Sequence, residues 1–304
     1  MNKIKIYLME LRAPFFTATI VPILLGTGIA YNLTNSINLF YFGLTLLGGL
    51  LLHGGANVIN DYFDHKSQND ELNKEFISPF TGGSRMIQEK LMTPKEVLIE
   101  AIVCLVLGSA IGIYLTIKIG LVILAIGIFG VFSAVFYVDP KVKLVGRGIG
   151  EIFIGLNFGI AMTFGAYFVQ TSQFSWIPII ASIPVAILIA ALLYINEFQD
   201  AKADEAVGKN HLVILLGKKR AANGYVFLML ATYLAVVIGV VTDSLPPITL
   251  SALLTIPIAF KAIKIAQENY DDSVKLAPAN ASTILNHLLT GILLIGSFFI
   301  DKWI

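Results

Sequence analysis

Two short acidic motifs stand out in a chain that otherwise avoids charge. Each begins with an asparagine and places two aspartates about one helical turn apart: Asn57, Asp61 and Asp64 in NVINDYFD, and Asn196, Asp200 and Asp204 in YINEFQDAKAD. Side chains at such spacings project from one face of a helix. Carboxylates grouped in this way repel one another, so the motifs predict a bound cation.

Oxygen ligands favour a hard divalent cation such as Mg²⁺, which typically shares one or two carboxylates with substrate phosphates. We therefore predict a site in which Mg²⁺ on a diphosphate is held by four aspartates: Asp61, Asp64, Asp200 and Asp204. A solvated acidic loop would explain either motif alone, but it does not explain two motifs of matching pattern. Asp70 and Glu71, which follow the first motif, are expected in a mobile, solvated loop, with approach of Asp70 to a metal as the alternative.

Basic side chains that could hold diphosphate oxygens lie in the same regions of the sequence. Arg12 precedes the first apolar run, and Arg85 lies in TGGSRMI, where Gly82 and Gly83 could turn backbone N–H groups toward an anion. Arginine binds phosphate through two N–H groups at once, so Arg12 and Arg85 are the stronger candidates. For any single lysine, the usual excess of positive charge at one membrane face is explanation enough.

The elements that position these residues must lie in a membrane. The chain has 304 residues, of which 56% are hydrophobic and 13% charged, with a mean hydropathy of +0.80. Soluble domains carry about 25% charged residues. Nine apolar segments are long enough to approach a bilayer span, at roughly 15–33, 38–60, 96–117, 119–138, 149–170, 175–197, 221–241, 247–266 and 282–300. Because backbone in lipid must satisfy its own hydrogen bonds, we predict an all-α bundle of about nine spans.

The basic residues orient this bundle. All of the 21 lysines and arginines except Lys118 and Lys302 fall on the side that holds the N-terminus, which we place in the cytoplasm. Two long loops on that side, about 61–95 and 198–220, are expected to carry the acidic motifs. We predict one domain, 1–304, built of repeated halves at about 1–140 and 141–304. A net charge of +1 argues against a nucleic-acid partner.

With these motifs in place, the sequence resembles the UbiA-type superfamily of intramembrane prenyltransferases, from LRAPFFTATIVPILLG to about Gly217. It is most similar to the 1,4-dihydroxy-2-naphthoate polyprenyltransferase branch of menaquinone biosynthesis. Three segments carry that narrower match: the Asp-x2-Asp spacing of NDYFD, the glycine-rich TGGSRMIQ, and GRGIGEIFIGLNFG. The 4-hydroxybenzoate branch usually has Asp-x3-Asp in the first motif.

The resemblance implies Mg²⁺-dependent transfer of a polyprenyl group from a polyprenyl diphosphate to an aromatic acceptor. It implies metal binding by the four aspartates and substrate contacts from eight further residues: Asn57, Asn196, Arg12, Arg85, Lys143, Lys209, Tyr137 and Glu151. The enzyme would sit in the cytoplasmic membrane, in contact with lipid, with its N-terminus and active-site loops in the cytoplasm.

The sequence departs from the naphthoate branch at several positions. In the second motif, NEFQD has Glu197 and Gln199 where that branch tends to have asparagine and arginine, and in GKNHL, His211 replaces a threonine. Another acceptor, such as 4-hydroxybenzoate or a lipid alcohol, therefore stays open. An alternative of a different class is a cation-coupled transporter, whose carboxylates would lie near the bilayer midplane.

Two polar residues inside apolar runs have simpler explanations than chemistry. His53 lies four residues before Asn57 on the same helical face, and we expect a packed, hydrogen-bonded histidine rather than a base. Asn157 is expected to hydrogen bond between helices, with contact to the acceptor as the alternative.

Overall fold

Apolar runs separated by short turns fold into an all-α bundle in the computed structural model, which describes residues 2–138, 142 and 144–304. The first half contains α1 (Lys3–Glu10), η1 (Ala13–Phe16), α2 (Thr17–Thr34), α3 (Leu39–Lys66), α4 (Asn69–Leu72), α5 (Pro94–Ile119) and α6 (Leu121–Val138). The second contains η2 (Leu144–Gly146), α7 (Gly150–Ile154), η3 (Gly155–Ala161), α8 (Met162–Thr171), α9 (Ile177–Ala206), α10 (Leu212–Leu216), α11 (Lys218–Val241), η4 (Pro247–Thr255), α12 (Ile256–Asn269) and α13 (Ser273–Asp301).

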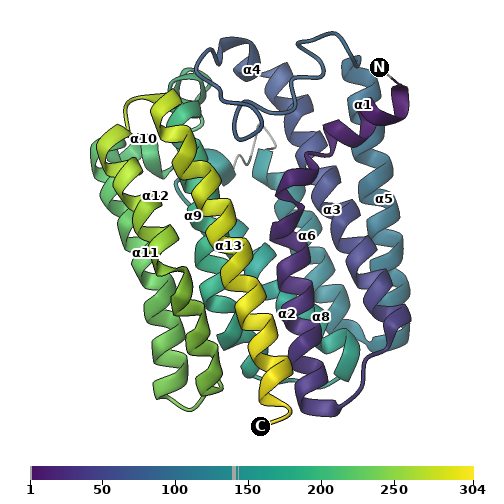
Figure 1. Ribbon diagram of the computed structural model, residues 1–304. Helices are drawn as coiled ribbons and strands as arrows, with labels where there is room; N and C mark the ends of the chain where they lie inside the picture. The colour runs from purple at the N-terminus through teal and green to yellow at the C-terminus, as the bar shows by residue number, and fades with distance from the viewer. Residues whose placement is uncertain (1, 139–141, 143) are drawn as a thin grey trace.

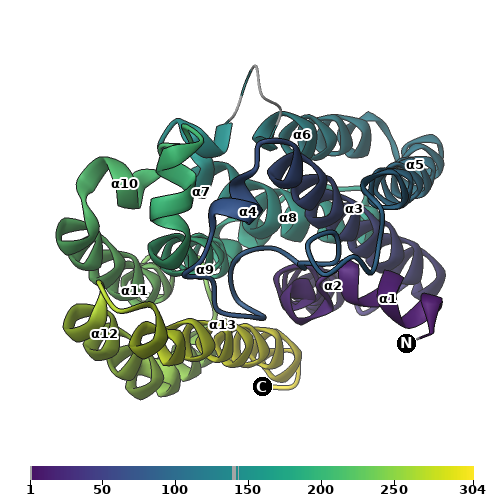
Figure 2. The same cartoon turned by 90° about the horizontal axis from the view of Figure 1, so that it is seen from above.

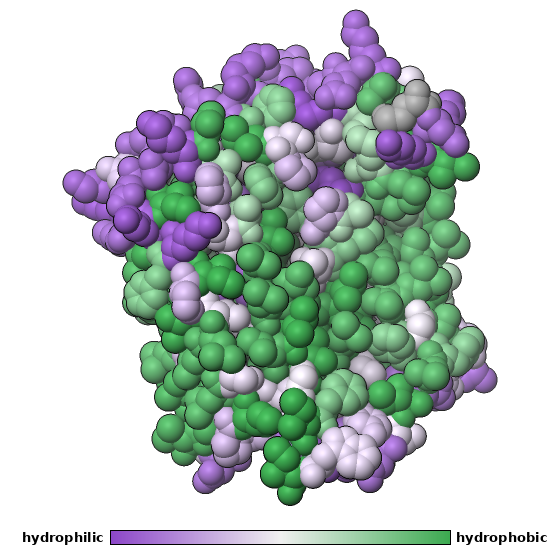
Figure 3. Space-filling model, in the orientation of Figure 1, coloured by the Kyte–Doolittle hydropathy of each residue, from purple (hydrophilic) through white to green (hydrophobic). Residues whose placement is uncertain are grey.

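Within the described residues, eight helical stretches are long and apolar enough to cross a membrane. They correspond to eight of the nine predicted spans; the segment expected at 119–138 is the shorter apolar helix α6. On the face shown in Figure 3, apolar side chains form a band across the middle, and hydrophilic ones gather at the two ends, most densely at the end that holds α1 and α4 (Figures 1 and 3). The chain is an integral membrane protein.

Local signals set the helix boundaries. At the start of α5, the Thr93 hydroxyl accepts from the Glu96 amide and the Glu96 carboxylate accepts from the Thr93 amide, with Pro94 at the first helical position. Gly159 allows the π-helical η3 to approach α9, because a Cβ there would lie 2.3 Å from the Cβ of Ala186. Such close contacts fix how the helices pack around the site.

The two acidic motifs lie at the same end of the bundle, in the last turns of α3 and α9 (Figure 2). This corrects the expectation that loops carry them, because α3 continues to Lys66 and α9 to Ala206. The positions of the aspartates are therefore fixed by helical backbone rather than by loops. The segment between α3 and α5, which contains the short helix α4, crosses over them.

Candidate active site

A polar cavity of about 120 Å³ lies between the ends of α3 and α9, beneath the segment that contains α4. Its lining includes Arg12, Asp64, Asp70, Gly83, Tyr137, Asn196, Glu197, Asp200, Asp204 and Lys209. The structure thus brings residues of both motifs together, although α3 and α9 are far apart in the chain. It also places Arg12 and Lys209, two basic residues predicted from the sequence, beside them.

Asp61 is buried beside this cavity. Its Oδ2 accepts a 2.8 Å hydrogen bond from the Ser84 amide, and its Oδ1 lies 3.8 Å from Nη1 of Arg12 with no hydrogen-bond partner. Gly83 makes room for this carboxylate: it has φ +72°, and a Cβ there would lie 2.8 Å from Asp61 Oδ1. A buried carboxylate oxygen without a partner is expensive, so it fits a cation or a donor from a ligand.

Lys209 bridges the two motifs. Its Nζ lies 2.5 Å from Asp64 Oδ1 and 3.5 Å from Asp204 Oδ1. Burial disfavours the charged lysine, but the carboxylates of Asp64 and Asp204 outweigh burial and raise the pKa of Lys209 well above its ordinary value. This lysine is therefore a fixed positive charge in the middle of the acidic cluster.

Two amides from the α4 segment cover the second motif. Asn69 donates a 2.8 Å hydrogen bond to Asp204 Oδ1, and Asn73 donates a 2.6 Å hydrogen bond to Asp200 Oδ1. Neither residue was among those predicted from the sequence. Their Asn-x3-Asn spacing repeats the period of the aspartate motifs and is the signal that could have found them.

Asp70 corrects a second expectation, because it is buried and lines the polar cavity instead of lying in a solvated loop. Burial, followed by the nearby charges of Asp64 and Asp61, raises the pKa of Asp70 to about 9. Arg85 donates a 2.6 Å hydrogen bond to the backbone carbonyl of Asp70. Arg85 therefore orders the α4 segment and is not part of the cavity lining.

Other predicted residues take positions around the cavity. Asn57 donates to the Leu11 carbonyl at 3.0 Å, and Glu151 accepts from the Leu212 amide at 2.9 Å; neither lines the cavity. Asn196 does line it and accepts a 2.6 Å hydrogen bond from Asn280. Lys143 lies outside the described residues.

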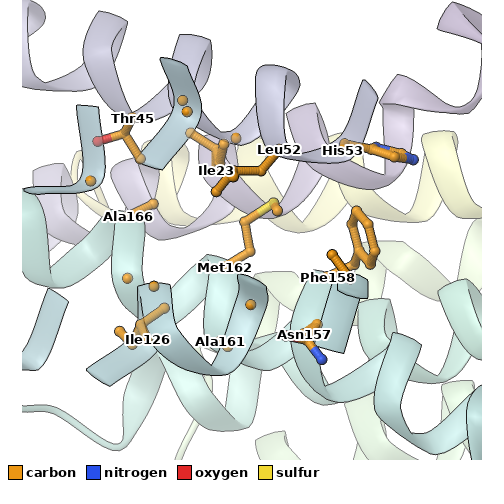
Figure 4. A pocket seen from close by; sticks show the side chains of 18 of the residues that line it. Ile23, Thr45, Leu52, His53, Ile126, Asn157, Phe158, Ala161, Met162 and Ala166 are labelled. Carbon is orange, nitrogen blue, oxygen red and sulfur yellow. The ribbon is translucent and has the colours of Figure 1, made fainter. Parts of the chain in front are cut away.

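An apolar chamber of about 210 Å³ lies deeper in the bundle, between α2, α3, α5, α6, η3 and α8. Ile23, Thr45 and Leu52 face Ile126, Ala161 and Met162 across it (Figure 4). Tyr137 lines both this chamber and the polar cavity, so the two spaces meet at its ring. Most of the side chains that line the chamber are apolar, as a site for a hydrocarbon chain requires.

The two polar residues inside apolar runs face this chamber as well. The His53 ring lies 2.8 Å from the Thr19 hydroxyl, which confirms the expected hydrogen-bonded histidine. Asn157 donates to the Ser133 hydroxyl at 2.8 Å, which confirms a hydrogen bond between helices. Asn157 lies in η3, and such π-helical turns occur frequently at functional sites.

The site chemistry fits Mg²⁺ shared with a ligand. Among the residues that the structure describes, no three histidine, cysteine or acidic side chains form a ready-made metal site. Mg²⁺ typically takes one or two carboxylates and completes its shell with water and phosphate oxygens. The unpartnered Asp61 Oδ1 and the facing carboxylates of Asp64, Asp200 and Asp204 provide oxygen ligands of this kind.

Fold and site together define an integral membrane protein with paired carboxylates at the ends of two spans and an apolar chamber beside them. The chain belongs to the UbiA prenyltransferase family, whose sequence model matches residues 19–285. It is therefore a prenyltransferase-family enzyme.

Three curated relatives show how distant the similarity is. The chain is 25% identical to the 2-carboxy-1,4-naphthoquinone phytyltransferase of Synechocystis, covering 97% of this chain and 93% of the relative. It is 28% identical to the 1,4-dihydroxy-2-naphthoate octaprenyltransferase of Bacillus subtilis, covering 91% and 87%. It is also 28% identical to UbiA prenyltransferase domain-containing protein 1 of Danio rerio, covering 85% and 75%.

A solved structure shares the fold. The UbiA homologue of Archaeoglobus fulgidus, bound to DMAPP and Mg²⁺, superimposes with a TM-score of 0.62 at 17% identity, covering 95% of this chain and 99% of that one.

Proposed function

We propose that this protein transfers a polyprenyl group from a polyprenyl diphosphate to an aromatic acceptor in an Mg²⁺-dependent reaction. The observation that carries the proposal is the meeting of the polar cavity and the apolar chamber at Tyr137. A molecule with a charged head and a long apolar tail fits the two spaces together. A transporter does not need this pairing, and its carboxylates would lie near the midplane rather than at helix ends.

The aspartates would hold the metal. Asp61 and Asp64 would do so from α3, and Asp200 and Asp204 from α9. Mg²⁺ bound there would act as a Lewis acid toward the diphosphate and stabilise its developing charge. The Archaeoglobus fulgidus homologue, described as bound to DMAPP and Mg²⁺, supports this assignment.

Different residues of the chain would then act on the diphosphate and on the allylic cation. Arg12 and Lys209 line the polar cavity and would neutralise diphosphate oxygens. The C–O bond of the donor breaks, and its electron pair leaves with the diphosphate. The face of the Tyr137 ring would stabilise the allylic cation that results, and the walls of the chamber would keep water from the cation.

We further propose 1,4-dihydroxy-2-naphthoate as the acceptor, in menaquinone biosynthesis. The spacing of NDYFD and the activity of the Bacillus subtilis relative, a 1,4-dihydroxy-2-naphthoate octaprenyltransferase, support this choice. The Synechocystis relative is a phytyltransferase for the related 2-carboxy-1,4-naphthoquinone. A carbon of the electron-rich ring would attack the allylic cation and form the new C–C bond, and the ring would release its carboxylate as CO₂. The reaction would take place at the cytoplasmic face of the cell membrane.

A prenyl-transfer assay on the purified protein in lipid tests this proposal. A labelled polyprenyl diphosphate, Mg²⁺ and a panel of acceptors would be supplied to the native protein and to Asp61→Asn and Asp200→Asn. We expect naphthoate product that needs Mg²⁺ and falls at least a hundredfold in both variants, on the order of what a lost electrostatic contact costs a transition state. Product only with another acceptor would reject 1,4-dihydroxy-2-naphthoate as the acceptor. Absence of diphosphate cleavage under every condition would reject the proposed prenyl-transfer activity.

A further inference from the structure

His211 lies between two buried carboxylates and takes no part in the reaction outlined above. Its Nε2 is 3.3 Å from Asp204 Oδ2, and its Nδ1 is 3.5 Å from Glu197 Oε2. All three side chains are buried, and the histidine is completely so. One imidazole therefore connects a predicted metal ligand to a second carboxylate behind it.

The backbone after α9 holds the imidazole in this place. Gly208 turns the chain with φ +72°, and the Lys209 amide donates to the Asp204 carbonyl at 2.8 Å. The chain thus folds back over the last turns of α9. The Leu212 amide then donates to Glu151, which fixes the residue immediately after His211.

The contacts of the two Asp204 carboxylate oxygens indicate what the His211 imidazole does. Oδ1 accepts from Asn69 and lies near Lys209, whereas Oδ2 lies 3.3 Å from His211 Nε2. This contact is an ion-pair distance without hydrogen-bond geometry, since neither ring nitrogen has a hydrogen-bond partner among the described residues. A polar group against each oxygen restricts the rotation of a carboxylate more than a group against one oxygen does. Glu197 lies two turns before Asp204 on the same face of α9 and restrains the other side of the ring.

We propose that His211, backed by Glu197, is a positioning residue that orients the Asp204 carboxylate toward Mg²⁺ and the diphosphate. This inference rests on the proposed function. His211 does not line the polar cavity, so it acts through Asp204 rather than on the substrate. Packing alone does not explain an imidazole here, because a buried polar ring costs free energy that an apolar side chain of similar size would not.

The test measures metal binding rather than turnover. Mg²⁺ titrations of the full-length protein in lipid nanodiscs would use geranyl S-thiolodiphosphate, which resists cleavage. His211→Leu removes both ring nitrogens, His211→Gln keeps an N–H donor for Asp204, and Glu197→Gln replaces the carboxyl group behind the ring with an amide. His287→Leu is the matched control: His287 is a fully buried histidine on α13 whose ring nitrogens, like those of His211, have no hydrogen-bond partner, but no acidic side chain among the described residues lies within ion-pair distance of it.

We expect His211→Leu to weaken Mg²⁺ binding by about 10- to 100-fold, the usual loss when a partner of a metal ligand is removed. His211→Gln should recover most of that loss, Glu197→Gln should weaken binding severalfold, and His287→Leu should stay within twofold of the native protein.

Three results would overturn the inference: binding within twofold of native in His211→Leu, no recovery in His211→Gln, or an equal loss in His287→Leu. If His211→Leu does not fold, the comparison of His211→Gln and Glu197→Gln with the native protein decides, and native affinity in Glu197→Gln counts against the inference. Failure of the native protein to bind Mg²⁺ with the analogue is a separate outcome, because it rejects the proposed function itself.

Discussion

At the scale of single residues, the balance between buried positive and negative charges determines how stable the site is. Lys209 is buried between Asp64 and Asp204, and it neutralises part of the acidic cluster when no metal is present. A buried charge that loses its partner is strongly destabilising, usually by about 3–5 kcal/mol. The same residue therefore contributes to stability and, by the proposal above, to diphosphate binding.

We expect Lys209→Met to lower the free energy of unfolding by about 3–5 kcal/mol without Mg²⁺, because it leaves two carboxylates facing each other. Added Mg²⁺ should recover part of this loss by binding only the folded protein. Thermal unfolding in mild detergent, with and without Mg²⁺, measures both effects. Lys202→Met is the control, since Lys202 forms an exposed ion pair with Glu75 that contributes little. Equal destabilisation in both variants would contradict the assignment.

Glu10, which lies outside the membrane-spanning segments, should make the stability of the protein depend on pH. Burial, followed by the charge of Asp61, raises the pKa of Glu10 from 4.5 to about 8, and Glu10 accepts a hydrogen bond from the Ser84 hydroxyl. The folded protein therefore binds a proton here that the unfolded chain releases. The stability that this proton provides is complete below about pH 4.5 and is lost as the pH rises through about 8.

We expect Glu10→Gln, which mimics the protonated acid, to flatten the fall in melting temperature between pH 5 and 8. Melting curves across that range, compared with those of the exposed control Glu89→Gln, would detect the difference. A native protein whose melting temperature rises over the same range would show that Glu10 is charged in the folded state.

At the scale of elements, the sequence predicted the helices well and the segment between α3 and α5 poorly. The face formed by Asn57, Asp61 and Asp64 follows directly from helical periodicity, because all three lie on α3. In residues 67–93, the spacing of Asn69 and Asn73 repeats that period, but the spacing alone does not indicate that the two side chains reach α9. Contacts of this kind depend on tertiary packing, and a local pattern does not encode them.

The contact between Glu197 and His211 shows the same limit. Both positions stand out in the sequence as departures from the naphthoate branch. Their distance in space depends on the turn after α9, which the sequence analysis did not predict. Both residues were therefore recognised from the sequence, but only the structure shows that they are in contact.

The chamber beside α6 leads to a prediction about donor length. Gly130 lines the chamber, and the nearest neighbour of a Cβ at that position is Asn157 Oδ1 at 4.0 Å. A leucine at position 130 would therefore enter open space rather than clash with the helix packing. We expect Gly130→Leu to lower kcat/KM at least tenfold for a long polyprenyl donor while leaving a five-carbon donor within threefold.

A comparison of products from donors of increasing length would measure this effect. Gly296→Leu on α13 is the control, because a Cβ there meets nothing within 4 Å and the residue does not line the chamber. Equal losses for short and long donors in Gly130→Leu would show that the tail takes another path.

At the scale of the whole molecule, the site lies at one end of a bundle whose middle is apolar. The polar cavity, α1 and the α4 segment share that end, and the short turn between α2 and α3 lies at the other (Figure 1). The distribution of basic residues predicts that the site end faces the cytoplasm, where a soluble diphosphate product would be released. The two predicted halves, about 1–140 and 141–304, each supply one acidic motif to it.

Single-cysteine labelling tests this orientation, because Cys104 is the only cysteine in the chain and it is buried. In a Cys104→Ser background, Ser36→Cys reports on the turn between α2 and α3, and Glu89→Cys on the site end; both native side chains are exposed. We expect a membrane-impermeant maleimide to label position 36 in intact cells and position 89 only after the membrane is permeabilised. The reverse pattern would place the site outside the cytoplasm. The reversed arrangement would put most of the 21 lysines and arginines on the outer face, against the usual charge bias, so labelling of position 89 in intact cells would refute the predicted orientation.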